Sequence, residues 1–125
     1  MADDTSAAPA TGDAPEISSL GPLAEDLLRK AAESRADRSA RTVVGGRGHV
    51  LSQTLMAFGA GTSLAEHENP GEATVIVVRG RVRLTVGDDF WEAAPYDLVV
   101  MPDAMHGLVA LEDSVVLLTV AKRQG

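Results

Sequence analysis

Imidazole side chains are the groups of this sequence best suited to chemistry, and the chain has three of them, His49, His67 and His106. A histidine can bind a metal ion or act as a general base near neutral pH. The chain has no cysteine, which excludes disulfides, thiolate zinc sites and a cysteine nucleophile. A serine nucleophile elbow, a phosphate-cradling glycine loop and a dinucleotide fingerprint are absent as well.

Short strands are the elements that must position these histidines. From Thr42 onward, β-rich runs alternate with Gly, Pro and Asp, and no helical pattern separates them. This spacing predicts an all-β fold, an antiparallel sandwich or barrel of the jelly-roll class. Arg79-Gly80-Arg81 and Gly87-Asp88-Asp89 have the composition of hairpin turns. We predict strands near Thr42–Val44, Val50–Phe58, Ala73–Arg79, Val82–Val86, Leu98–Met101, His106–Leu111 and Val115–Ala121, with a further short strand around Trp91.

The first part of the chain has a different texture. Residues 1–16 are acidic and rich in Ala, Thr and Pro, so we expect a disordered tail without the features of a secretory signal. Apolar residues then recur at three- and four-residue spacing and predict a helix from Pro22 to about Ala32. Its single apolar stripe must pack on the outside of the barrel, close one of its ends, or form a dimer contact. We divide the chain into a tail (1–16), a helix and linker (17–41) and a barrel (42–125).

Two stretches resemble the two sequence motifs of the cupin family. Residues 61–80 match the first motif, G-x5-H-x-H-x3-E-x6-G, at Gly61, His67 and Gly80. Both glycines suit a tight turn or a positive φ. Residues 97–106 resemble the second motif, with Pro102 before His106. The resemblance covers about residues 45–121 and implies a conserved-barrel, RmlC-like jelly roll, which is an antiparallel double-stranded β-helix.

The resemblance also implies a metal set, and the match to it is incomplete. In metal-binding cupins, two histidines and a glutamate from the first motif and one histidine from the second converge inside the barrel. His67 and His106 match the first and last of these, but Asn69 replaces the second histidine and Ala73 replaces the glutamate. If a bulge re-aimed Glu72, then His67, Glu72 and His106 would form a two-histidine, one-carboxylate site for one Fe, Mn, Ni or Zn ion.

An organic ligand is the alternative occupant of the same barrel. Gln53 shares one face of its predicted strand with His49, and a buried amide needs hydrogen-bond partners. His49 is otherwise a strand-start residue that follows a glycine-rich turn. Trp91 suits half-buried packing and would report binding. We predict a ligand cavity lined by His67, Asn69, Gln53 and His106.

Charge and hydropathy say less about partners. The net charge is −7, four of the negative residues lie in the tail, and the sign reverses between Arg29 and Arg47. We interpret this basic segment as a solvated face rather than an anion or nucleic-acid contact. No apolar stretch approaches the ~20 residues of a membrane helix, so we expect a soluble, cytoplasmic protein with no membrane partner.

Three functions remain open at this point. The first is the binding of a small organic ligand in the barrel, without assured catalysis. The second is a metal-dependent dioxygenase or isomerase that uses His67, Glu72 and His106. The third is a partner-binding or regulatory protein that acts through the tail and the Arg29–Arg47 segment. The cupin resemblance also implies a homodimer.

Overall fold

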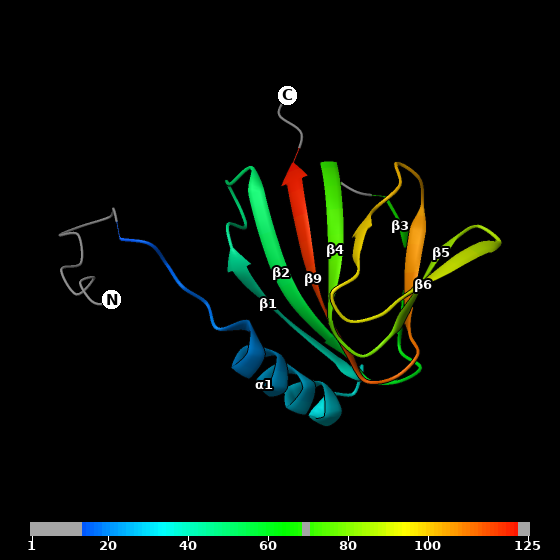
Figure 1. The fold of residues 1–125 in the computed structure, drawn as a ribbon, viewed down its shortest axis with the longest axis horizontal. Helices are drawn as coiled ribbons and strands as arrows, with labels where there is room; N and C mark the ends of the chain where they lie inside the picture. The colour runs from blue at the N-terminus through cyan, green and yellow to red at the C-terminus, as the bar shows by residue number, and fades with distance from the viewer. Residues whose placement is uncertain (1–13, 69–70, 123–125) are drawn as a thin grey trace.

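Two antiparallel sheets face each other and form a jelly-roll barrel (Figure 1). The structure is a computed structural model of the 125-residue chain, and it describes residues 14–68 and 71–122. The all-β prediction, with one helix before the strands, is therefore confirmed. Most of the expected tail, up to residue 13, lies outside the described residues.

One sheet has five strands and the other has four. The five-stranded sheet contains, in spatial order, β1 (Arg38–Val44), β2 (Leu51–Phe58), β9 (Ser114–Lys122), β4 (Gly71–Arg79) and β7 (Leu98–Val100). The four-stranded sheet contains β3 (Ser63–His67), β8 (His106–Ala110), β5 (Val82–Val86) and β6 (Asp89–Ala93). All the predicted strands are present to within a few residues at each end, β3 is additional, and β1 begins at Arg38 instead of Thr42.

The main core lies between the two sheets, because alternate side chains of each strand point inward. Val75 and Val77 of β4 and Val116 of β9 meet Leu84 of β5 and Leu108 of β8 there. Each of these side chains is buried. This alternation of inward and outward side chains, with a period of two residues, made the strands predictable from the sequence.

Helix α1 (Leu20–Glu33) packs on the outer face of the five-stranded sheet (Figure 1). Leu27 and Ala31 are buried against Leu55 of β2 and Val115 of β9. Of the positions considered for its apolar stripe, the outside of the barrel is the observed one. No helix within residues 14–68 and 71–122 is both long and apolar enough to cross a membrane.

Gly80 lies in a connection between the sheets rather than in a hairpin. β4 belongs to the five-stranded sheet and β5 to the four-stranded one, so the Arg79-Gly80-Arg81 turn carries the chain across. The hairpin prediction was wrong here because composition alone does not distinguish a hairpin from a sheet-to-sheet turn. Gly87 does lie in a hairpin, since Val86 pairs with Asp89.

Candidate functional site

The fold brings His67 and His106 side by side. His67 ends β3, His106 begins β8, and the two residues pair directly across these strands. Their ring centroids are 5.0 Å apart and their planes are tilted by 55°. His106 is 4% exposed, whereas His67 lies at the exposed end of its strand. One imidazole is therefore buried and its neighbour lies closer to solvent.

A β-bulge in β3 turns His67 toward the interior. Leu64 pairs with Leu108 and His67 with His106, so β3 uses one more residue than β8 between these pairs. In a regular strand, side chains three positions apart point to opposite faces of the sheet. The bulge changes this alternation and brings His67 to the same face as Leu64, so both residues line the same cavity. Glu66, inside the bulge, accepts a hydrogen bond from the Gly87 backbone N–H at 3.1 Å.

Each imidazole is held by the hydrogen bond that its Nδ1 makes with the backbone carbonyl two residues earlier in the chain. Nδ1 of His67 lies 3.0 Å from the carbonyl oxygen of Ala65, and Nδ1 of His106 lies 2.8 Å from that of Ala104. A carbonyl oxygen can only accept, so Nδ1 carries the hydrogen in both rings. In the neutral ring, Nε2 is then a hydrogen-bond acceptor or a metal ligand. The site presents two such nitrogens.

The two rings border an apolar cavity inside the barrel, which we call the histidine chamber. Its volume is about 260 Å³. Apart from the histidines, the lining side chains in the described part of the chain carry no charge and no strong hydrogen-bonding group. The lining consists of Met56, Leu64, His67, Val75, Met101, His106, Gly107, Leu108, Val116 and Leu118. An apolar cavity with two hydrogen-bond acceptors has the character of a binding site for a small organic molecule.

Comparison with solved structures identifies the fold. SPY1581, a conserved protein of unknown function from Streptococcus pyogenes, is 27% identical with a TM-score of 0.64, over 74% of this chain and 80% of that one. An RmlC-like cupin protein from Desulfovibrio desulfuricans is 26% identical, with a TM-score of 0.59, over 67% and 81%. A cupin superfamily protein from Desulfitobacterium hafniense has a TM-score of 0.63 at 17% identity, over 69% and 78%. The chain folds as a small cupin domain.

Sequence comparisons add no match for this cupin domain. No protein-family model matches the chain, and no curated protein matches it. The likeness therefore establishes the architecture, while the chemistry has to be argued from the residues themselves.

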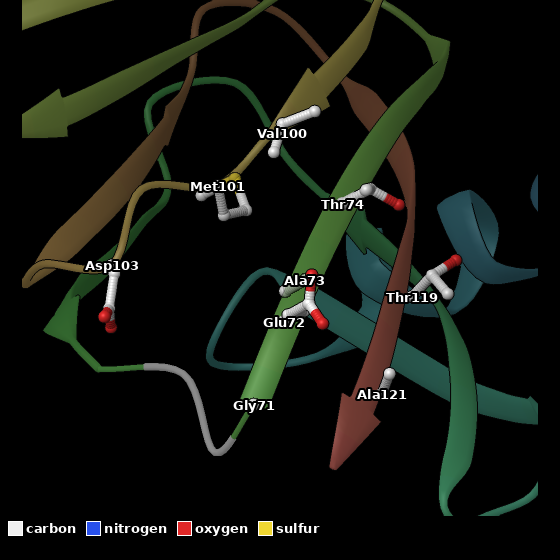
Figure 2. Close-up of a pocket in the computed structure, with 9 residues that line it drawn as sticks. All are labelled: Gly71, Glu72, Ala73, Thr74, Val100, Met101, Asp103, Thr119 and Ala121. Carbon is white, nitrogen blue, oxygen red and sulfur yellow. The ribbon is translucent and has the colours of Figure 1, made fainter. Parts of the chain in front are cut away.

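Glu72 does not join the two histidines. In β4 it lies between Gly71 and Ala73, which are both buried, and its own side chain is exposed on the opposite face. Figure 2 shows it at a cavity of about 440 Å³ where the chain leaves β7, near Thr74, Thr119 and Asp103. The bulge needed to re-aim Glu72 is absent from the described part of β4 near this residue, where the pairing with β9 runs without a shift from Gly71 to Val77.

These side chains do not fit a resident metal ion. Among residues 14–68 and 71–122, no group of three or more His, Cys, Asp or Glu side chains could hold one. Ala73, at the position of the motif's glutamate, is buried on the interior face, where it supplies no ligand atom. Two imidazoles fall short of the three or four protein ligands that zinc sites use. The predicted set of His67, Glu72 and His106 is therefore not assembled.

The remaining predicted residues have different positions. Gln53 does not line the histidine chamber: it shares its face of β2 with Leu55, on the side of α1, and its Nε2 donates to Thr119 at 3.0 Å. His49 precedes β2 and is exposed. Asn69 lies outside the described residues. Sequence reasoning interpreted Met56 and Met101 as core or cavity lining, and both line the chamber. It missed Leu64, because β3 is mostly exposed and shows no clear alternation.

Proposed function

We propose that this cupin domain binds a small organic molecule in the histidine chamber, with His67 and His106 as its polar anchors. The observation that supports the proposal most strongly is the pair of Nδ1 hydrogen bonds to backbone carbonyls. They fix both rings and leave both Nε2 atoms for a ligand. Fixed polar groups in an apolar pocket are what orient and select small molecules.

A metal ion held by His67 and His106 has less support than an organic ligand. Among the described residues, the two nitrogens come without a carboxylate in a metal-binding group. Of the two glutamates adjacent to His67 in sequence, Glu66 accepts a hydrogen bond from the β5–β6 turn and Glu68 is exposed. An organic ligand needs no further protein ligands, since the apolar wall supplies most of its contact. The proposal does not require catalysis.

The test uses the histidine rings as probes. We would assign the ring signals of the three histidines by NMR with single His→Gln variants, then add neutral and acidic fragments one at a time. We expect at least one fragment class to shift the signals of His67 and His106 and to raise the melting temperature. His49 is the internal control, because it is exposed and lies outside the chamber lining.

Two outcomes would overturn the proposal. In one, no fragment shifts either chamber histidine. In the other, binding shifts His49 alone, which would place the ligand on the surface. Metal analysis of untagged protein adds an independent check: a transition metal at one ion per chain would favour an ion-binding function instead.

A further inference from the structure

A second apolar cavity adjoins the histidine chamber, and we call it the tryptophan chamber. Its volume is about 290 Å³. The two chambers share Met101 and His106. The lining consists of Leu84, Val86, Trp91, Val99, Val100, Met101, Pro102 and His106. His106 therefore serves both spaces, and a ligand anchored on it has two directions in which to extend.

The polar content of both chambers is very low. Among the described residues that line the tryptophan chamber, the only strong hydrogen-bonding side-chain groups are the His106 imidazole and the Trp91 indole N–H. Within residues 14–68 and 71–122, no side chain that lines either chamber is a carboxylate, ammonium or guanidinium. Moving an ionised group from water into such a space is costly without a charged partner. The lining therefore favours an uncharged ligand.

The anchor also sets which polar group the ligand must carry. Nδ1 of His106 donates to the carbonyl of Ala104, so in the neutral ring Nε2 is the acceptor. A ligand must then offer a donor such as a hydroxyl group. An ether, an ester or an ionised carboxylate has no hydrogen to donate, so by covering the His106 ring it would cut Nε2 off from water and leave it without a partner.

The walls beyond His106 suit a flat ring. Trp91 points to the same side of the four-stranded sheet as its partner Leu84, yet it is 57% exposed. A large aromatic surface beside a cavity gains stacking or edge contacts when an aromatic ligand covers it. Met101, between the two chambers, adds a thioether that contacts aromatic rings favourably.

We propose that the ligand is an uncharged aromatic alcohol of the phenol class, which donates its O–H to Nε2 of His106 and extends past Met101 to cover Trp91. This inference rests on the proposed function, because it uses the same anchor. It goes further by assigning the chemical class of the ligand and by making the tryptophan chamber part of the binding site.

The test compares three probes that share one apolar body: para-butylphenol, butylbenzene and para-butylbenzoate. Trp91 is the only tryptophan of the chain, so its emission reports on this chamber alone. We expect para-butylphenol to shift the emission to shorter wavelength and to bind about tenfold more tightly than the other two, the gain of about one hydrogen bond. In His106→Ala, the phenol should bind no more tightly than butylbenzene.

Two controls separate binding from folding. His49→Ala should keep the full preference for the phenol, because His49 lines neither chamber. If His106→Ala does not fold, the methyl ether of the phenol, para-butylanisole, provides the same test on wild-type protein. It has no O–H and should bind about as weakly as butylbenzene.

The outcomes distinguish this inference from the proposed function. Binding of para-butylphenol without a change in Trp91 emission, or tighter binding of the benzoate, would overturn the phenol assignment. If other fragments still shift the rings of His67 and His106, the proposed function stands in that case. If no fragment shifts those rings, both fail together.

Discussion

One hydrogen bond per ring decides what the site histidines offer to a ligand. In both rings the acceptor is the carbonyl two residues earlier in the chain, Ala65 for His67 and Ala104 for His106. Such a partner fixes the tautomer and the orientation of an imidazole. The chemistry of the site therefore depends on local backbone geometry at the ends of β3 and β8 as much as on the histidines themselves.

Glycines set that backbone geometry around the motif, and two of them allow a matched prediction. Gly61 and Gly80 have φ of 87° and 78°. A Cβ at Gly61 would meet nothing within 4 Å, whereas one at Gly80 would lie 2.3 Å from the carbonyl oxygen of Asp113. Alanine pays about 1–2 kcal/mol for a left-handed conformation. We expect Gly61→Ala to cost about that much and Gly80→Ala clearly more, measured by denaturant unfolding. Equal losses would contradict the steric argument.

At the scale of the element, the β5–β6 hairpin has an ionic cluster on its outer face. Arg81 and Arg83 donate to the two carboxylate oxygens of Glu92, at 2.7 and 3.0 Å. The Arg83 guanidinium also lies 4.2 Å from the ring centre of Phe90. The hydrogen bond from Arg81, followed by that from Arg83, holds the pKa of Glu92 below its usual value. Glu92 is therefore ionised more readily in the folded protein than in the unfolded chain.

This cluster predicts a pH-dependent contribution to stability. Because the pKa of Glu92 is lower in the folded protein, its stabilising effect is present above the unfolded pKa and is lost as the pH falls through the folded pKa. We expect Glu92→Gln to melt at a lower temperature than wild type at pH ~7, and the gap to close as the pH falls below ~4. Glu33→Gln, at the exposed end of α1, is the control. A gap that stays constant with pH would refute this role.

Helix α1 depends on its contact with the sheet, since isolated helices of this length are marginal in water. Leu27 is 3% exposed and packs with Leu55 and Val115. We expect Leu27→Ala to lower the free energy of unfolding by about 2–5 kcal/mol. Arg29→Ala, which removes only a pairing with Asp26 on the exposed side, should cost less than about 1 kcal/mol. Urea unfolding measures both, and similar losses would mean that α1 is not anchored by its apolar face.

The sequence predicted the strands that have one buried face better than the strands that are mostly exposed. Strands with one buried face, such as β4, show the alternation and were predicted, whereas β3 is mostly exposed and was not. The resemblance to the cupin motif placed His106 in the barrel, whereas alternation assigned Gln53 to the wrong face, because nothing in the sequence states which face of a strand meets the helix. The bulge that turns His67 inward depends on pairing with β8, a long-range contact that local spacing does not encode.

At the scale of the whole molecule, α1 covers only part of the outer face of the five-stranded sheet. It packs against β1, β2 and β9, and leaves the outer side of β7 open. Tyr96, Leu98 and Val100 alternate along this edge and are 79%, 60% and 74% exposed. Edge strands normally carry charges or other devices that prevent pairing with a second chain. β7 is short, with three residues, but none of them is charged.

The cupin resemblance implies a homodimer, and we propose that its two copies pair through this edge. An antiparallel edge is complementary to itself across a twofold axis, and pairing would bury the apolar side chains of both copies. We expect light scattering to give the mass of two chains for wild type. Leu98→Asp should shift the mass toward one chain, since Leu98 lies on the edge and lines neither chamber. Ile17→Asp, at an 87% exposed position before α1, should stay dimeric. A wild-type protein that remains monomeric at high concentration would rule out the dimer, while a dimer that Leu98→Asp leaves intact would move the interface to another face.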